Sequence, residues 1–157
     1  MKVAADTGAL VSLQLCGILE KSFEHFTYYI GKRIKEELEE LSRYDDEIGI
    51  AAREVLSFIG KGIEVVETGE HEEGEYEALE ILNKLNAQLL ISDDIKFVKK
   101  LQDERVSFST IILFILHKAG VITKEDALNA LDLIFERRKW SENLIYITAR
   151  AMLEKDE

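Results

Sequence analysis

The chain alternates short apolar segments with amphipathic ones, and this alternation constrains its fold more than any other feature. Four segments have the β-branched, aromatic and aliphatic residues of buried strands, at residues 2–5, 26–30, 63–66 and 88–91. A segment with helical periodicity follows each of them. Because parallel strands need crossover connections, which helices usually provide, the pattern predicts an α/β fold with a parallel sheet covered on both faces.

The expected helices have recognisable start and stop residues. They are predicted at residues 7–19, 32–44, 47–59, 75–86, 95–102, 109–119, 124–136 and 142–153. Thr7 is the expected N-cap of the first helix and Thr123 of the helix at 124–136, whereas Gly60 and Gly120 are placed to end helices. The sequence leaves a fifth strand near residues 105–108 open.

The length of the chain favours one domain over residues 1–157, because a chain of roughly 150 residues buries about 70% of its unfolded surface in a single core. Beyond the possible strand near residues 105–108, the last third consists of helical segments. We therefore expect a helical C-terminal extension over about residues 123–157, attached to the α/β part.

Charge and cysteine usage restrict the classes of function. The net charge of −11 argues against a broad electropositive face for nucleic acid, although a local basic patch remains compatible with it. Cys16 is the only cysteine, so the chain can form no intrachain disulfide and no cysteine-based zinc site, and a cytosolic setting is expected. The apolar run at 111–116 is much shorter than the ~20 residues of a membrane helix, and we expect no membrane insertion.

Acidic residues follow two of the predicted strands. Asp6 ends the first apolar run, and Asp93 and Asp94 end the fourth. Glu75 begins a predicted helix after a strand and a loop, and Glu37 lies one turn into another. Since the carboxyl ends of parallel strands meet at one edge of the sheet, these acids are expected to converge there. Clustered carboxylates repel one another unless a cation is present, and magnesium or manganese prefers such oxygen ligands. A metal site of this kind suits phosphodiester hydrolysis.

Each acid also has a structural explanation. Asp6 suits a helix N-cap as well as it suits a ligand, and Glu37 belongs to an acidic run that is typical of a solvated helix face. Glu75 is a favourable charge for a first helical turn. Asp93 and Asp94 are also typical of a turn and cap before the next helix.

The remaining candidates are weaker. The three histidines have no partners at metal-ligand spacing, and Cys16 is expected in the core. A small basic cluster follows Asp94, and solvated helix charges explain it as well as a phosphate contact does. The histidines are His25, His71 and His117, and the basic cluster consists of Lys96, Lys99 and Lys100.

Three segments together resemble the successive acidic motifs of PIN-domain nucleases. They are Val3-Ala4-Ala5-Asp6-Thr7-Gly8-Ala9-Leu10, Gly74-Glu75-Tyr76-Glu77-Ala78-Leu79, and Leu89-Leu90-Ile91-Ser92-Asp93-Asp94 followed by Phe97 and Lys100. The stretch from Ser107 to Ile122 is similar to the helical segment after the last motif in a prokaryotic subgroup related to VapC toxins.

The resemblance implies a three-layer α/β/α fold and an acidic pocket that binds Mg²⁺ or Mn²⁺. Position by position, its catalytic acids match Asp6, Glu37, Glu75 and Asp94, with Asp93 as a neighbour that could replace Asp94. The implied metal ligands are Asp6, Glu75, Asp93 and Asp94, supported by a hydroxyl from Thr7 or Ser92. The match at Glu36-Glu37 is short, serine replaces the more usual threonine before the acidic pair, and few arginines surround the motifs in sequence.

The function expected from these residues and this resemblance is metal-dependent endonucleolytic cleavage of single-stranded or looped RNA. VapC-like proteins usually act as homodimers beside an antitoxin, so an antitoxin and a second copy are the implied protein partners. The alternative is a PIN-fold interaction or RNA-binding module with little or no activity. A phosphate-transferring domain is a third hypothesis, but a haloacid-dehalogenase-like phosphatase would need an aspartate where this chain has Gly8.

Overall fold

A five-stranded, all-parallel sheet forms the centre of the computed structural model, which describes residues 1–140 and 143–156. The strand order is β3-β2-β1-β4-β5. The bounds are Lys2–Ala5 for β1, Thr27–Ile30 for β2, Ile63–Val65 for β3, Leu89–Ile91 for β4 and Val106–Ser107 for β5. The predicted α/β class is confirmed, and the strand that the sequence left open is β5.

The central strand β1 pairs with β2 on one side and with β4 on the other. Val3, Ala4 and Ala5 are completely buried, as expected for a strand covered on both faces. The chain adds β2 and β3 on one side of β1 before it crosses to β4 and β5 on the other. Open α/β sheets bind ligands at the carboxyl ends of their strands where the order reverses in this way, which here means the ends of β1 and β4.

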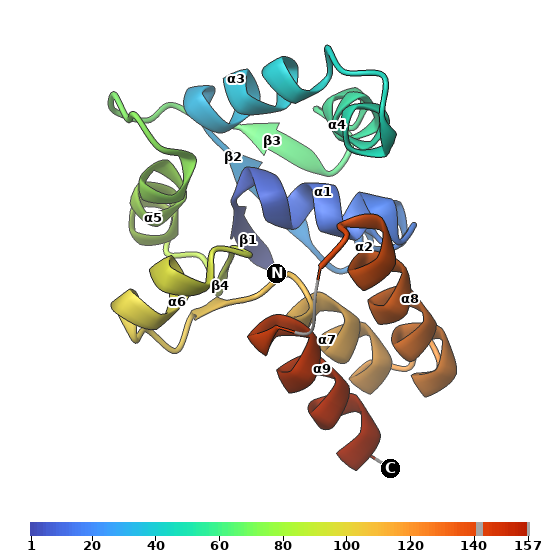
Figure 1. The fold of residues 1–157 in the computed structure, drawn as a ribbon. Coiled ribbons are helices and arrows are strands. Elements are labelled where there is room, and N and C mark those ends of the chain that lie inside the picture. The colour runs from blue at the N-terminus through green and yellow to red at the C-terminus, as the bar shows by residue number, and fades with distance from the viewer. Residues whose placement is uncertain (141–142, 157) are drawn as a thin grey trace.

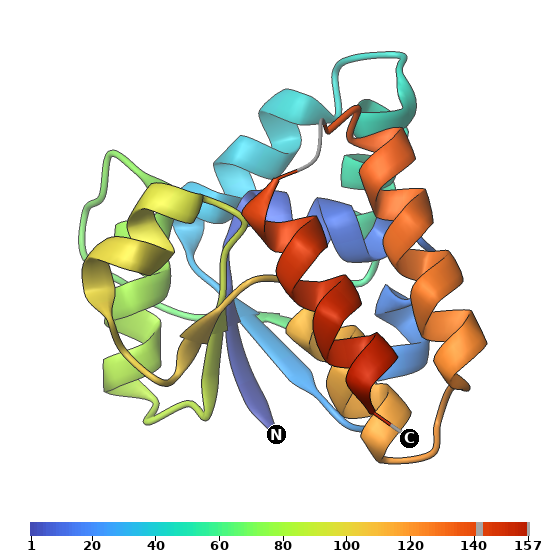
Figure 2. The same ribbon diagram turned by 60° about the horizontal axis from the view of Figure 1, so that its bottom comes forward.

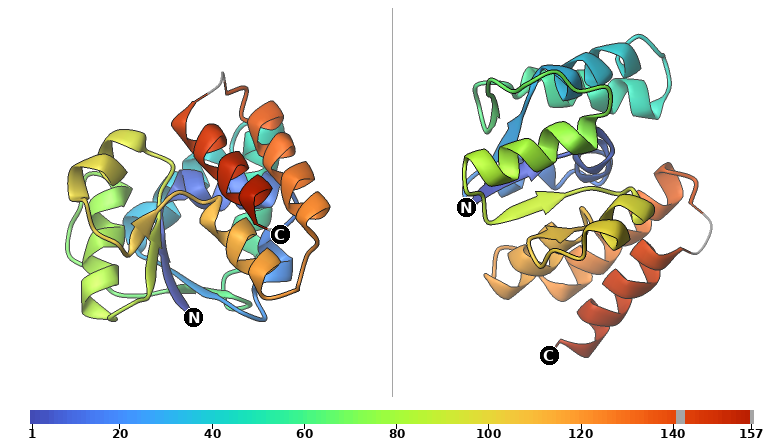
Figure 3. Two further views of the ribbon diagram at one scale, coloured as in Figure 1. Left: turned by 90° about the horizontal axis from the view of Figure 1, so that it is seen from below. Right: turned by 90° about the vertical axis from the view of Figure 1, so that its left-hand side faces the viewer.

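Helices cover both faces of the sheet. Their bounds are Thr7–Leu15 (α1), Leu19–Ser22 (α2), Lys32–Leu41 (α3), Glu47–Ser57 (α4), Gly74–Lys84 (α5), Ile95–Leu101 (α6), Ile111–Lys118 (α7), Lys124–Arg137 (α8) and Leu144–Lys155 (α9). α5 and α6 lie on one side of the strands, whereas α1, α7, α8 and α9 lie on the other (Figures 1 and 2). The views along other axes show the same three layers, with α5 in front of the sheet in the right-hand view (Figure 3).

Several predicted helix boundaries are corrected by the structure. The first helix ends at Leu15 and not at residue 19, because Gly17 takes a left-handed conformation (φ +75°) that interrupts it before α2. Its N-cap is Asp6 and not Thr7. Thr123 caps α8 as predicted, in a reciprocal bond pattern with Asp126. The helix predicted from 109 begins at 111, and the predicted start of the last helix, Glu142, lies outside the described residues.

The C-terminal extension packs against the α/β part through α8. Leu131 and Ile134 of α8 are completely buried, and α8 contacts both α1 and α7. The Arg137 side chain donates a hydrogen bond from Nη1 to the carbonyl oxygen of Leu15 at 2.6 Å, which joins the end of α8 to the end of α1. No described helix is long and apolar enough to span a bilayer.

Candidate active site

Asp6 follows β1 directly, and its side chain lies at the carboxyl edge of the sheet. Ala5 of β1 is in register with Ile91 of β4, so Asp6 lies beside Ser92, whose hydroxyl donates to Asp6 Oδ2 at 3.0 Å. The Thr7 backbone N–H donates to Oδ1 at 2.7 Å. The side chain is only 9% exposed, and this burial raises the pKa of Asp6 to about 6 despite the two hydrogen bonds. Asp6 is therefore both the cap of α1 and a buried acid with an unusually high proton affinity.

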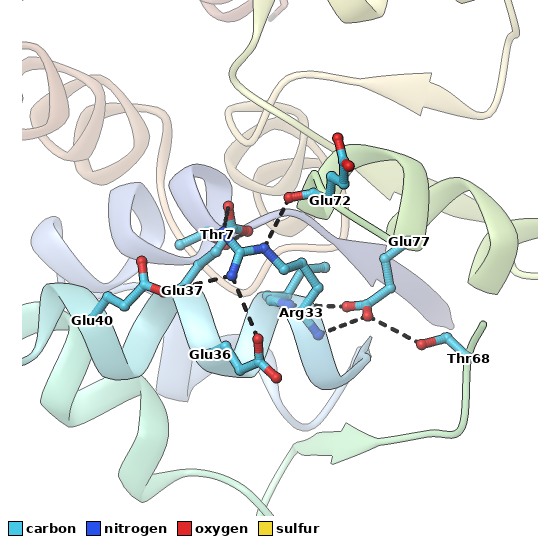
Figure 4. A network of polar contacts seen from close by, with 9 residues as sticks. Thr7, Arg33, Glu36, Glu37, Glu40, Thr68, Glu72 and Glu77 are labelled. Carbon is cyan, nitrogen blue, oxygen red and sulfur yellow. Dashed lines mark hydrogen bonds and ion pairs between the residues drawn. The ribbon is translucent and has the colours of Figure 1, made fainter. Parts of the chain in front are cut away.

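Glu37 of α3 turns away from the acidic surface of its helix and toward α1. Its Oε1 accepts a hydrogen bond from the Thr7 hydroxyl at 2.9 Å, and its Oε2 lies 3.9 Å from the Arg33 guanidinium (Figure 4). Partial burial is the main reason that the pKa of Glu37 is raised. The prediction of a solvated helix face holds for the exposed Glu39 and Glu40 but not for Glu37.

The start of α5 meets the carboxylates of Asp6 and Glu37. A Cβ atom on Gly74 would collide with Glu37 Oε1 and lie 3.3 Å from Asp6 Oδ1, so a larger residue here would displace the Glu37 carboxylate. The next residue is Glu75, in the first turn of α5 as predicted. Burial, a hydrogen bond with the Glu73 carboxyl group and repulsion from Asp6 together raise the pKa of Glu75 to about 7. Three predicted acids thus come together at this edge of the sheet.

The two aspartates after β4 point to different surroundings. Asp93 is half-buried and accepts hydrogen bonds from the Ser12 hydroxyl and from the backbone and hydroxyl of Ser109, all at 2.8–2.9 Å. Its charge also raises the pKa of Asp6. Asp94 is exposed and caps α6 by accepting from the Phe97 N–H at 3.0 Å. The structure therefore places Asp93 beside Asp6, and Asp94 fits the cap alternative.

Asp94 still borders the site from outside. A surface pocket of about 140 Å³ is lined by Asp94 and Glu75 together with Tyr76 and Lys100. Lys100 lies 5.9 Å from the centre of the Tyr76 ring. The predicted basic cluster after Asp94 thus contributes two lysines, Lys96 and Lys100, to the rim of the carboxylate site.

Two arginines that the sequence motifs did not indicate lie near these acids. Arg33 of α3 binds the backbone carbonyl of Glu72 and pairs with Glu36, Glu37 and Glu40 (Figure 4). Arg138, at the end of α8, is half-buried near α1: a Cβ on Gly8 would lie 3.4 Å from its Nη2. Only the packing of α8 on α1 brings Arg138 here, so no local sequence signal could have identified it.

Glu77 has a structural role that the sequence did not reveal. It is 1% exposed, and its carboxylate accepts hydrogen bonds from the backbone N–H groups of Arg33 and Ile34 and from the Thr68 hydroxyl (Figure 4). Because Gly31 gives α3 no capping side chain, Glu77 takes the place of one. This contact fixes the start of α3 and thereby the position of Glu37.

The chemistry of the donor set fits a hard divalent cation. Residues 1–140 and 143–156 contain no three His, Cys, Asp or Glu side chains already arranged to hold a metal ion. The converging groups are nevertheless carboxylates, and the pKa values of Asp6, Glu37 and Glu75 are all raised. A cation among them would offset both their mutual repulsion and the cost of their burial.

The sequence matches no protein-family model and none of the curated proteins with which it was compared. The family resemblance therefore depends on the motifs of the chain itself, and it stays a prediction.

Proposed function

We propose that the protein is a metal-dependent endoribonuclease of the PIN-domain type, with its site at the carboxyl ends of β1 and β4. The observation that supports this most strongly is the convergence of the acids Asp6, Glu37 and Glu75 on the switch point of a parallel sheet, with Asp93 beside them. Mutual repulsion and burial both oppose such a cluster, and a cation would stabilise it.

Asp6, Glu75 and Asp93 would hold the Mg²⁺ or Mn²⁺ ion, with Glu37 at the edge of the set. When bound, the ion would supply a water molecule of lowered pKa and neutralise charge on the phosphate. The residues around the acids orient them: Ser92 and the Thr7 N–H fix the two oxygens of Asp6, and the Thr7 hydroxyl fixes Glu37. RNA as the substrate follows from the family resemblance alone.

The decisive experiment is cleavage of single-stranded RNA by the purified chain with Mn²⁺ and with EDTA. We expect Mn²⁺-dependent endonucleolytic products from the wild type and a loss of more than about 100-fold in Asp6→Asn, since even partners that only orient metal ligands contribute about 10- to 100-fold. Glu24→Gln is the matched control, because Glu24 is an exposed acid at the opposite edge of the sheet. Equal cleavage by wild type and Asp6→Asn would contradict the site.

The inactive interaction module remains the second candidate, and the bonding of Asp93 favours it. Both Asp93 oxygens already accept hydrogen bonds from Ser12 and Ser109, as in an acid that joins structural elements. Mn²⁺ binding by calorimetry that is lost in Asp6→Asn, together with no cleavage over a broad panel of RNAs, would support the module and reject the nuclease.

A further inference from the structure

Arg138 is held in a fixed place by the end of α8. The neighbouring Arg137 bonds the carbonyl oxygen of Leu15, and buried Ile134 packs in the core one turn earlier. The Arg138 guanidinium carbon lies 5.5 Å from the centre of the Trp140 ring, on which it is positioned for a cation–π contact. The side chain thus extends toward Gly8, two residues after Asp6.

The charges around Arg138 favour a positive group at this place. Burial lowers the pKa of Arg138, whereas attraction to Asp93 and Asp6 acts in the opposite direction. An arginine stays protonated under such conditions, because its pKa is far above neutrality. A half-buried guanidinium therefore lies at the edge of the carboxylate site.

Arg138 also forms part of a larger cavity of about 490 Å³. One wall consists of Arg137, Arg138 and Lys139, and the opposite wall includes the acids at residues 45–47. The three consecutive basic residues are a local positive patch in a chain of net charge −11. A phosphate in this cavity would be attracted by the three basic side chains and repelled by the three acids opposite them, so a polyanionic strand would follow the basic wall.

We propose that Arg138 contacts a backbone phosphate of single-stranded RNA at the carboxylate site, with the basic wall of the cavity as the path of the strand. This inference rests on the proposed function, since the position of Arg138 next to Gly8, two residues after Asp6, matters only if a phosphate is placed there. The planar guanidinium, with its fork of N–H donors, matches a phosphate better than a lysine ammonium does. The contact makes the C-terminal extension part of the substrate site.

Binding of a fluorescent 12-nucleotide single-stranded RNA, measured by anisotropy in EDTA over a range of salt concentrations, tests this contact without cleavage. We expect about tenfold weaker binding by Arg138→Gln, as for the loss of a charged hydrogen bond. The slope of log affinity against log salt should fall by about 0.7 in Arg138→Gln, the value for one phosphate contact on a single strand. Arg138→Lys should keep the slope and bind several-fold more weakly than the wild type.

Arg150→Gln is the matched control, because Arg150 is an arginine on α9 that pairs with Asp132 and Glu154. Its affinity and slope should equal those of the wild type. Equal RNA binding by Arg138→Gln and Arg150→Gln, or no RNA binding by the wild type, would overturn the proposal. Thermal unfolding verifies the fold of each variant, and Arg138→Lys provides the test if Arg138→Gln does not fold.

The outcomes separate this inference from the nuclease proposal. If the wild type cleaves RNA and Arg138→Gln does so with unchanged kcat and KM, the nuclease stands and the phosphate contact is wrong. If binding depends on Arg138 but no cleavage occurs with Mn²⁺, the contact stands and the nuclease is wrong.

Discussion

Acidic side chains occur in two contrasting regions of this protein. At the carboxyl edge of the sheet, Asp6, Glu37 and Glu75 are buried or half-buried among one another, and burial is the largest cause of their raised pKa values. Each is oriented by neighbouring groups, yet the region contains more carboxylates than cations that face them.

On the periphery, two acids bond basic side chains, and the pKa values of both are lowered. Glu80 bonds His71 at 2.8 Å, and Asp103 bonds Arg105 at 2.9 Å. Carboxyl groups in this chain therefore bind protons more tightly than usual at the sheet edge and more weakly than usual in these peripheral pairs. Ionised acids are therefore stabilised by their partners in these surface pairs, whereas burial and mutual repulsion make ionised acids unfavourable at the sheet edge.

Asp6→Asn should remove the buried acid with the largest expected effect on the pH dependence of stability. The pKa of Asp6 is raised from its ordinary 3.8 to about 6, so the stability that it contributes is present below about pH 4 and is lost as the pH rises through 6. In EDTA, the free energy of unfolding of the wild type should fall relative to that of Asp6→Asn by about 2.5 kcal/mol between pH 4 and pH 7.5. Urea denaturation at several pH values measures this difference.

The control for this pH series is Glu24→Gln, which should follow the wild type throughout. Adding Mn²⁺ at pH 7.5 should stabilise the wild type and leave Asp6→Asn almost unchanged, because a cation that binds only the folded carboxylates shifts the equilibrium toward folding. Parallel curves for wild type and Asp6→Asn in EDTA would show that Asp6 is not a destabilised acid.

The location of the acids at this edge of the sheet could be predicted from the sequence because it depends only on the topology of the sheet. Alternation of strands and helices predicts a parallel sheet, and a parallel sheet places Asp6 next to the residues that follow β4. Neither step requires knowledge of side-chain contacts. The same reasoning could not choose between Asp93 and Asp94, because neighbouring residues after a strand point in different directions and the turn decides which one faces the site.

The contributions of the C-terminal extension lay beyond what the sequence could predict. The helical pattern predicted α8, but the side of the sheet that α8 covers depends on how Leu131 and Ile134 pack in the core. The proximity of Arg138 to α1 follows from that packing. The first helix was predicted four residues too long for a local reason, since the left-handed turn at Gly17 is compatible with the surrounding apolar pattern.

Asp93 and Asp94 are neighbours in sequence, but Asp93 belongs to the carboxylate site and Asp94 is an exposed helix cap, so substitutions at the two positions compare the two regions. Asp93→Ala would leave the hydroxyl groups of Ser12 and Ser109, both completely buried, without their acceptor. We expect a loss of about 2 to 3 kcal/mol in the free energy of unfolding. Asp94→Ala removes one helix cap and should cost about 1 kcal/mol. Urea denaturation at pH 7 in EDTA compares the two, and equal losses would contradict the assignment of Asp93 to the interior of the site.

Glu80→Gln should have the smallest effect and the opposite pH dependence. The pKa of Glu80 is lowered, first by its hydrogen bond with His71, so its contribution to stability is present above the ordinary value of 4.5 and is lost as the pH falls through its lowered pKa. Because the pair is partly exposed, the unfolding temperature at pH 7 should fall by less than about 3 °C. In thermal unfolding, the wild type should be more stable than Glu80→Gln at pH 7 and lose this advantage toward pH 3, whereas Asp6→Asn should become more stable relative to the wild type as the pH rises. A Glu80→Gln variant that becomes more stable relative to the wild type as the pH rises from 4 to 7.5, as expected for Asp6→Asn, would remove the distinction between the paired periphery and the carboxylate site.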